Sequence, residues 1–237
     1  MAGVRTDTKF SNRILASLSK ADADRIVPYL SRAVFEVGKT LLAPGEKSKF
    51  AYFMEDGLTS MVTSLSDGST VEIGLLGREG MVGMHGLMGA GTQPFHSFIQ
   101  LGGSGFRIKA DVVAQEFDRS EKFRRKLFLF SQAQLVQTAQ IAACNRRHDV
   151  HERLARWLLT CRDRCDSDLI ELTHEFLAQM LGAPRTTVTL AAGVLQNSGL
   201  IEYSRGKVRI LDREGLEETA CECYSLIRDE FVRLKVF

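Results

Sequence analysis

The stretch from 172 to 213 constrains the fold of this chain more than any other part of the sequence. Thr173 can cap a first helix, Gly182 allows a sharp turn, and Pro184 suits the first position of a second helix. The apolar face of that second helix consists of Val188, Ala191, Ala192 and Leu195. Two helices joined by a short turn that contains glycine are the pattern of a helix-turn-helix.

The residues that follow predict a two-stranded wing. Apolar runs at 200–203 and 208–211 flank the turn Ser204-Arg205-Gly206-Lys207, which is typical of a β-hairpin. We expect the second helix to enter a major groove, while the basic wing meets phosphates. The predicted DNA contacts are Thr173, Arg185, Thr186, Thr187, Thr189, Leu190, Gln196, Arg205, Lys207 and Arg209. The alternative is a helical hairpin that only packs beside a β-ribbon.

This stretch resembles the winged helix-turn-helix of the Crp/Fnr family of bacterial transcription regulators. The matching residues are Leu172-Thr173, Leu177-Ala178, Leu181-Gly182, Arg185, Val188, Leu195 and Gly199-Leu200-Ile201. The resemblance implies a homodimer that binds a palindromic site on double-stranded DNA and works together with RNA polymerase. It also implies that a signal in an N-terminal domain controls the affinity for DNA.

The first half of the chain predicts an antiparallel β-roll. Short runs with strand character alternate with turn signals between about 31 and 110, and Asp67-Gly68 is a good hairpin signal. The segments 41–46 and 51–57 resemble the start of the jelly-roll effector domain of Crp/Fnr proteins. The expected fold class is therefore α+β, with an N-terminal antiparallel β-roll (jelly roll), a long dimerisation helix and a C-terminal winged helix-turn-helix.

The segment that would hold a cyclic nucleotide departs from the family pattern. Gly83 matches the glycine of the phosphate-binding cassette, but Met84 stands where those proteins have glutamate, and Arg107 is the only arginine or lysine between 79 and 108. Ordinary cyclic AMP binding is therefore not expected, since a buried phosphate lacks its positive partner. Either a different ligand or side chains alone fill the pocket, and no cofactor is predicted. The candidate pocket residues are Met81, Gly83, Met84, His85, Met88, Phe95, His96 and Phe98.

A long helical segment follows the roll. Seven of its residues recur at alternating spacings of four and three, as in a coiled-coil seam. These residues are Phe123, Leu127, Phe130, Gln134, Gln137, Ile141 and Cys144. The family resemblance implies that this helix pairs with its twin in a parallel homodimer, and the alternative is a helix packed on its own domain. Phe128, Leu129 and Leu135 lie off the seam, so the helix is apolar on more than one side.

Four units are predicted along the chain of 237 residues. The effector-sensing roll with short N-terminal helices spans 1–110, and the dimerisation helix spans 111–147. The DNA-binding domain spans 148–213, and a helical tail, too acidic to favour contact with DNA, spans 214–237.

Several other functions lack support in the sequence. Net charge is only +2, so coating of nucleic acid without sequence preference is disfavoured. No apolar run approaches the roughly 20 residues that span a membrane, and the N-terminus lacks an apolar signal core, so a cytoplasmic location is expected. No catalytic residues are predicted, because paired carboxylates, a nucleophile elbow and a P-loop are lacking. The remaining candidate is a ligand-sensing scaffold protein whose helical end contacts protein rather than DNA. Salt dependence distinguishes the two, because binding to DNA should weaken steeply as the salt concentration rises.

The five cysteines, all in the C-terminal half, favour a cytosolic protein with free thiols. Cys144 and His148, with His151 or Glu152, could share a helix face near Cys161 and Cys165 and hold a metal ion at the hinge. The simpler interpretation, unconnected polar residues and small buried thiols, is preferred, so no metal ligands are predicted.

Overall fold

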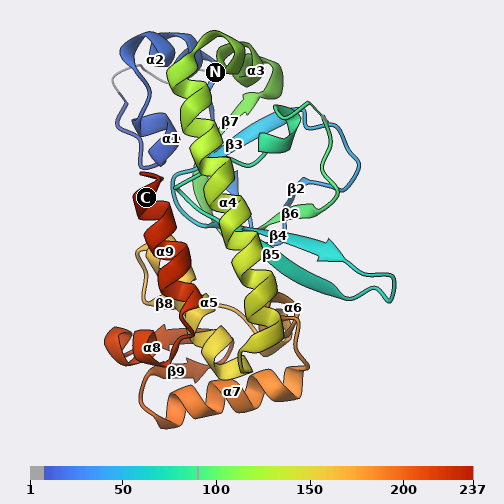
Figure 1. Ribbon diagram of the computed structural model, residues 1–237, viewed down its shortest axis with the longest axis vertical. Coiled ribbons are helices and arrows are strands. Elements are labelled where there is room, and N and C mark those ends of the chain that lie inside the picture. The colour runs from blue at the N-terminus through green and yellow to red at the C-terminus, as the bar shows by residue number, and fades with distance from the viewer. Residues whose placement is uncertain (1–7, 90, 237) are drawn as a thin grey trace.

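The chain folds into a β-roll flanked by one long helix, with a helical domain beneath both (Figure 1). This computed structural model describes residues 8–89 and 91–236. The outer ends of the predicted units, residues 1–7 and 237, lie outside the described residues. The domain division at 110, 147 and 213 stays a prediction, although the order of elements confirms the expected α+β class.

Two short N-terminal helices are tied to the roll. They are α1 (Arg13–Ala16) and α2 (Lys20–Ile26), the latter continued by the 3-10 turn η1 (Val27–Tyr29). The buried Asn12 caps α1 by accepting from the backbone N–H groups of Ile14 and Leu15. Its side-chain amide donates to the carbonyl groups of Met54 and Gly80, which fixes α1 against the roll.

The roll consists of two antiparallel sheets, as predicted. One has the order β1 (Ser31–Phe35), β7 (Gly103–Lys109), β3 (Phe50–Met54), and the other β2 (Thr40–Leu42), β6 (His96–Leu101), β4 (Leu58–Ser64), β5 (Thr70–Leu76). The predicted turn at Asp67-Gly68 joins β4 to β5; Gly68 has a φ of 83° there, a conformation that favours glycine. The 3-10 turn η2 (Met84–Gly86) lies between β5 and β6.

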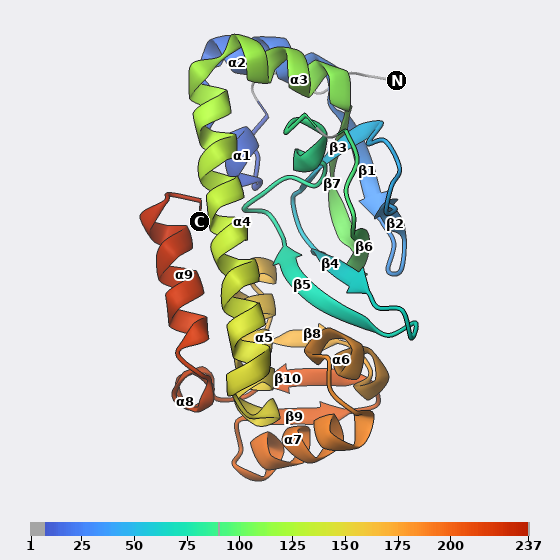
Figure 2. The same ribbon diagram turned by 45° about the vertical axis from the view of Figure 1, so that its right-hand side comes forward.

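The predicted helix at 111–147 is in fact two helices. The first is α3 (Ala110–Arg119) and the second is α4 (Glu121–Arg147), 27 residues long. Ser120 separates them: its backbone is extended, and its side chain accepts from the N–H of Phe123 to cap α4. In Figures 1 and 2, α4 runs along most of the length of the molecule.

The predicted seam of α4 faces the molecule's own core. Phe123, Leu127 and Phe130 belong to the apolar core of the roll, and each is at most 3% exposed. Farther along the helix, Gln137, Ile141 and Cys144 are also buried, and Gln134 is half-buried beside Met61. The 4-3 pattern is therefore explained by packing within one chain, so these side chains are not free to contact a partner. The large apolar side chains left exposed on α4 are instead Phe128 and Leu135.

The C-terminal domain is built around the buried helix α5 (Val150–Cys165). It continues through β8 (Leu169–Glu171), α6 (His174–Leu181), α7 (Arg185–Asn197), β9 (Ile201–Ser204) and β10 (Lys207–Ile210). The predicted hairpin of β9 and β10 gains a third strand, because β8 pairs with β10 on its other edge. Trp157 of α5 is fully buried in the core that these elements share.

The tail forms α8 (Arg213–Thr219) and α9 (Cys223–Arg233). Helix α9 lies along α4 in both views of the ribbon (Figures 1 and 2). Ile227, Phe231, Leu234 and Val236 join the same apolar core as the roll. The tail therefore returns from the C-terminal domain and packs against the roll and α4. Among the described residues, no helix combines the length and the apolar character needed to cross a membrane.

Candidate nucleic-acid interface and effector cavity

The helix-turn-helix is built by the local signals that the sequence contains. Thr173 caps α6, since its hydroxyl accepts from the N–H of Phe176 at 3.2 Å. Gly182 ends α6 in the left-handed conformation with φ of 54°, which turns the chain towards Pro184 and α7. In α7, Val188, Ala191, Ala192 and Leu195 are buried, as the apolar pattern predicts. The opposite face of α7 is open to solvent at the end of the molecule (Figure 2).

Three predicted base-reading residues lie on this open face. Arg185, Thr186 and Leu190 are exposed, and the guanidinium of Arg185 lies 3.8 Å from a carboxylate oxygen of Glu175. Leu190 is 72% exposed, which leaves its methyl groups free for contact with another molecule.

The other predicted contacts on the two helices are partly engaged within the chain. Thr173 serves as the cap of α6, and Thr187 is half-buried. The hydroxyl of Thr189 donates to the carbonyl of Arg185. Gln196 accepts from the backbone N–H of Tyr203 at 2.8 Å, and so connects α7 to the wing.

The wing presents three basic side chains from a tight turn. Arg205 and Gly206 both have positive φ, 49° and 75°, as in the two-residue turns that suit hairpins. Lys207 pairs with Glu171 at 2.5 Å, and Arg209 lies 4.0 Å from Glu202. Exposed pairs of this kind contribute about 0–1 kcal/mol, so phosphate groups can compete for both cations.

His174 is a residue of this interface that the sequence analysis missed. Its ring stacks on Tyr203 of the wing, with centroids 4.1 Å apart, and its Nδ1 lies 3.1 Å from the hydroxyl of Thr189 on α7. Burial, and then the nearby Arg185, hold the pKa of His174 below its usual value. A neutral imidazole thus links the first helix, the second helix and the wing. No periodicity or motif marks such a contact in the sequence.

A cavity of about 400 Å³ lies between the roll and α4. Four of the predicted pocket residues line it: Met84, His85, Met88 and Phe95. The ring of His85 packs edge-on against Phe95, with centroids 4.7 Å apart. The remaining lining residues are Met61 and Ile73 of the roll and Ser131, Gln132, Gln134, Leu135 and Thr138 of α4.

The other four predicted pocket residues lie elsewhere. Met81 is buried in the core of the roll, and Gly83 turns the chain beside the carbonyl of Phe50. His96 is 2.8 Å from the hydroxyl of Thr40, and Phe98 packs edge-on against Phe176 of α6. Strand alternation explains why the last two lie together, because His96 and Phe98 share one face of β6.

The cavity lining is poorly suited to a phosphate group. It contains no arginine or lysine among the described residues, and burial lowers the pKa of His85, which favours the neutral ring. The hydroxyl of Ser131 is buried and has no hydrogen-bond partner among the described residues. The lining therefore suits a mainly apolar molecule with a single polar group.

Buried polar contacts join the roll to the DNA-binding domain. Arg164 of α5 donates to Glu79 at 2.7 Å and to Gln137 of α4 at 2.8 Å. Glu72 of β5 accepts from the indole N–H of Trp157 at 2.9 Å and from the hydroxyl of Ser60 at 2.6 Å. The sequence analysis did not identify these contacts, two of which connect residues 85 positions apart.

The cysteines group differently from the set considered in the sequence. Cys144 and His148 do lie together, but Cys221 and Cys223 complete their cluster. Cys161 is fully buried in the core of the DNA-binding domain, and Cys165 packs against the same core. The spacing Cys-X-Cys at 221–223 was the signal available in the sequence.

Comparisons with known proteins agree with this architecture. Residues 152–219 match the Crp-like helix-turn-helix domain family. The global nitrogen regulator of Synechococcus elongatus is 23% identical over 78% of this chain and 87% of its own length. The structure of FixK2 from Bradyrhizobium japonicum superposes with a TM-score of 0.70 at 16% identity, over 81% of this chain and 98% of that chain. The c-di-GMP-responsive global regulator CLP of Xanthomonas campestris gives 0.66 at 18% identity, over 81% and 99%.

Proposed function

The chain belongs to the Crp/Fnr family of DNA-binding transcription regulators, and we propose that it acts as a homodimer controlled by a ligand in the cavity beside α4. The main observation in support of this control is that the cavity lies against α4. Ser131, Gln132 and Leu135 line the cavity from the same helix that presents Leu135 to solvent. A molecule in this cavity would touch both the roll and the surface available for a second subunit.

The exposed stripe of α4 supports the homodimer. Phe128 is 52% exposed and Leu135, seven residues later, is 69% exposed. Gln132, Ala139 and Ala142 are exposed between and beyond them at spacings of three and four residues. Such a stripe is typical of a helix that packs against another helix, and small alanines allow close approach.

The ligand would be mainly apolar and would carry one hydrogen-bonding group for Ser131. Its binding would shift α4, and through Gln137 and Arg164 the shift would reach α5 of the DNA-binding domain.

In the dimer bound to DNA, each α7 would occupy a major groove. The centres of the two half-sites would be about one helical turn of DNA, or a small multiple of it, apart. We further propose RNA polymerase as a partner, a cytoplasmic location and no enzymatic activity. The alternative of a scaffold protein is not favoured.

Selection of bound sites from random duplex DNA tests the function. We expect a two-fold palindrome with one strongly required G·C pair in each half, read by Arg185, next to a position that prefers thymine beside Leu190. The Arg185→Ala variant should lose about 1–3 kcal/mol of discrimination at that pair, because a bidentate contact to guanine disappears.

The Lys207→Ala variant is the matched control. It should weaken binding to all sequences alike and reduce the salt slope by about 1, since it removes one phosphate contact. If Arg185→Ala leaves the base preferences unchanged, α7 is not the reading element. If the unmodified protein selects no site, the proposal for sequence-specific binding fails.

A further inference from the structure

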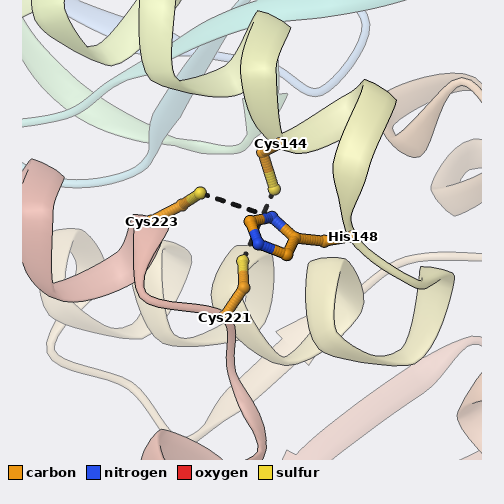
Figure 3. Close-up of side chains that lie close together, drawn as sticks. All are labelled: Cys144, His148, Cys221 and Cys223. Atoms are coloured by element: carbon orange, nitrogen blue, oxygen red, sulfur yellow. Dashed lines mark hydrogen bonds between the residues drawn. The ribbon is translucent and has the colours of Figure 1, made fainter.

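Four potential metal ligands converge where α4 ends and α9 begins. They are Cys144, His148, Cys221 and Cys223, and their ligand atoms all lie within 4.8 Å of one another. Figure 3 shows the three sulfur atoms surrounding the imidazole ring of His148. The Sγ atoms of Cys144 and Cys221 are 3.5 Å apart, and the Sγ of Cys223 is 3.5 Å from Nδ1 of His148.

Two short segments deliver these ligands. Cys144 and His148 are four residues apart at the end of α4, so they share one face of that helix. Cys221 and Cys223 flank Glu222 at the start of α9. Cys221 lies 77 positions after Cys144 in the sequence. Each segment thus offers a pair of ligands, and the packing of α9 along α4 brings the pairs together.

The spacing fits a single tetrahedral ion. Zinc–sulfur bonds of about 2.3 Å in a tetrahedron place neighbouring ligand atoms roughly 3.8 Å apart. The two measured separations of 3.5 Å fall slightly below this value, and the upper limit of 4.8 Å lies above it, so small side-chain rotations suffice. A [4Fe–4S] cluster, in which each thiolate binds a different iron, needs more widely separated sulfur atoms.

The surroundings of the cluster match those of known metal ligands. Nε2 of His148 is 3.1 Å from a carboxylate oxygen of Glu222, which leaves Nδ1 facing the sulfur atoms. A carboxylate on the far nitrogen is the usual partner of a metal-bound histidine. Gln140 donates from its side-chain amide to Sγ of Cys223 at 3.1 Å. These contacts would orient a histidine and a thiolate for a metal ion.

A buried positive charge also lies close to the cluster. The three cysteines are at most 5% exposed, and Arg156 of α5 is buried nearby. Nε of Arg156 has no hydrogen-bond partner among the described residues. A buried guanidinium beside three thiols balances the negative charge that they carry when bound to a divalent cation.

We propose that Cys144, His148, Cys221 and Cys223 bind one zinc ion through three thiolates and one imidazole. All four tetrahedral positions are supplied by protein, so the site is structural and holds no open position for a substrate. The ion fastens the tail to the junction between α4 and α5. A disulfide between Cys144 and Cys221 is the competing use of these thiols, but it would leave Cys223 and His148 without a role.

Metal analysis of the full chain tests the site. Protein purified under reducing conditions, stripped with a chelator and returned to zinc should retain about one ion per chain after gel filtration. Cobalt in place of zinc should give the intense visible bands and the sulfur-to-cobalt charge transfer of a tetrahedral thiolate site. Removal of zinc should lower the thermal unfolding temperature of the unmodified protein.

Cysteine variants separate this site from adventitious binding. Cys221→Ser and Cys223→Ser should lose the ion and the charge-transfer band, whereas Cys165→Ser, a half-buried cysteine outside the cluster, should keep both. If a variant fails to fold, the cobalt spectrum of the unmodified protein decides alone. Absence of metal uptake by the reduced protein, cobalt bands without charge transfer to sulfur, or equal loss in Cys165→Ser would overturn the proposal.

Discussion

Glu72 makes the contact between the roll and α5 dependent on pH. It is fully buried between the roll and α5, where it accepts from Trp157 and from Ser60. Burial raises the pKa of Glu72 to about 7, although its hydrogen bonds and the charges of Arg156 and Arg164 oppose the shift. Near neutral pH this carboxyl group therefore exchanges its proton at the interface between the roll and the DNA-binding domain.

We expect the folded state to lose stability between about pH 4.5 and 7 because of Glu72. Its folded pKa lies above the unfolded value of 4.5, so its stabilising effect is complete below pH 4.5 and disappears as pH rises through 7. A difference of this size corresponds to about 3 kcal/mol. Glu72→Gln, which imitates the protonated form, should remove this part of the pH dependence. Urea unfolding at several pH values measures it, and an unchanged profile in the variant would contradict the assignment.

At the scale of elements, α4 shows what periodicity can predict and what it cannot. The 4-3 pattern from Phe123 to Cys144 predicts a long helix with a buried side, and that helix exists. The same pattern cannot state whether the buried side faces a partner or the chain's own roll, because both are apolar. The break between α3 and α4 at Ser120 could not be predicted either, since a single capping serine does not alter the local composition. Local signals such as Thr173 and Gly182, by contrast, determine their own surroundings and were predictable.

The exposed stripe leads to a prediction about assembly. The unmodified protein should sediment at about twice its chain mass of 26.4 kDa. Leu135→Glu should yield a folded monomer, because Leu135 is 69% exposed within one chain, so the fold tolerates a charge there and the paired surface does not. Leu127→Glu should instead destabilise the chain itself, because Leu127 is fully buried. Sedimentation combined with circular dichroism distinguishes the two results. A dimer that survives Leu135→Glu would place the contact elsewhere.

At the scale of the whole molecule, the roll, the helices α4 and α5 and the tail are held together by contacts that sequence patterns do not predict. Arg164 joins α5 to Glu79 of the roll and to Gln137 of α4, and the tail returns to pack along α4. In the sequence, Arg164 and Glu79 look like ordinary surface polar residues. Their burial follows only from how roll, helix and tail meet. The order and type of the units could be predicted, whereas the junction and the cysteine cluster depend on long-range packing.

Breaking the junction should loosen the whole molecule. The side chains of Arg164 and Glu79 are 2% and 1% exposed, so Glu79→Ala leaves a buried guanidinium without its carboxylate. Removal of one partner of a buried pair costs about 3–5 kcal/mol, which chemical denaturation can measure.

The exposed pair of Glu202 with Arg209 provides the control for this comparison. Its side chains are 63% and 54% exposed, so Glu202→Ala should change stability by less than about 1 kcal/mol. The double variant Glu79→Leu with Arg164→Met should recover much of the loss, because it removes the uncompensated charge and fills the space. If Glu79→Ala behaves like Glu202→Ala, the pair of Arg164 and Glu79 does not hold the roll and the DNA-binding domain together.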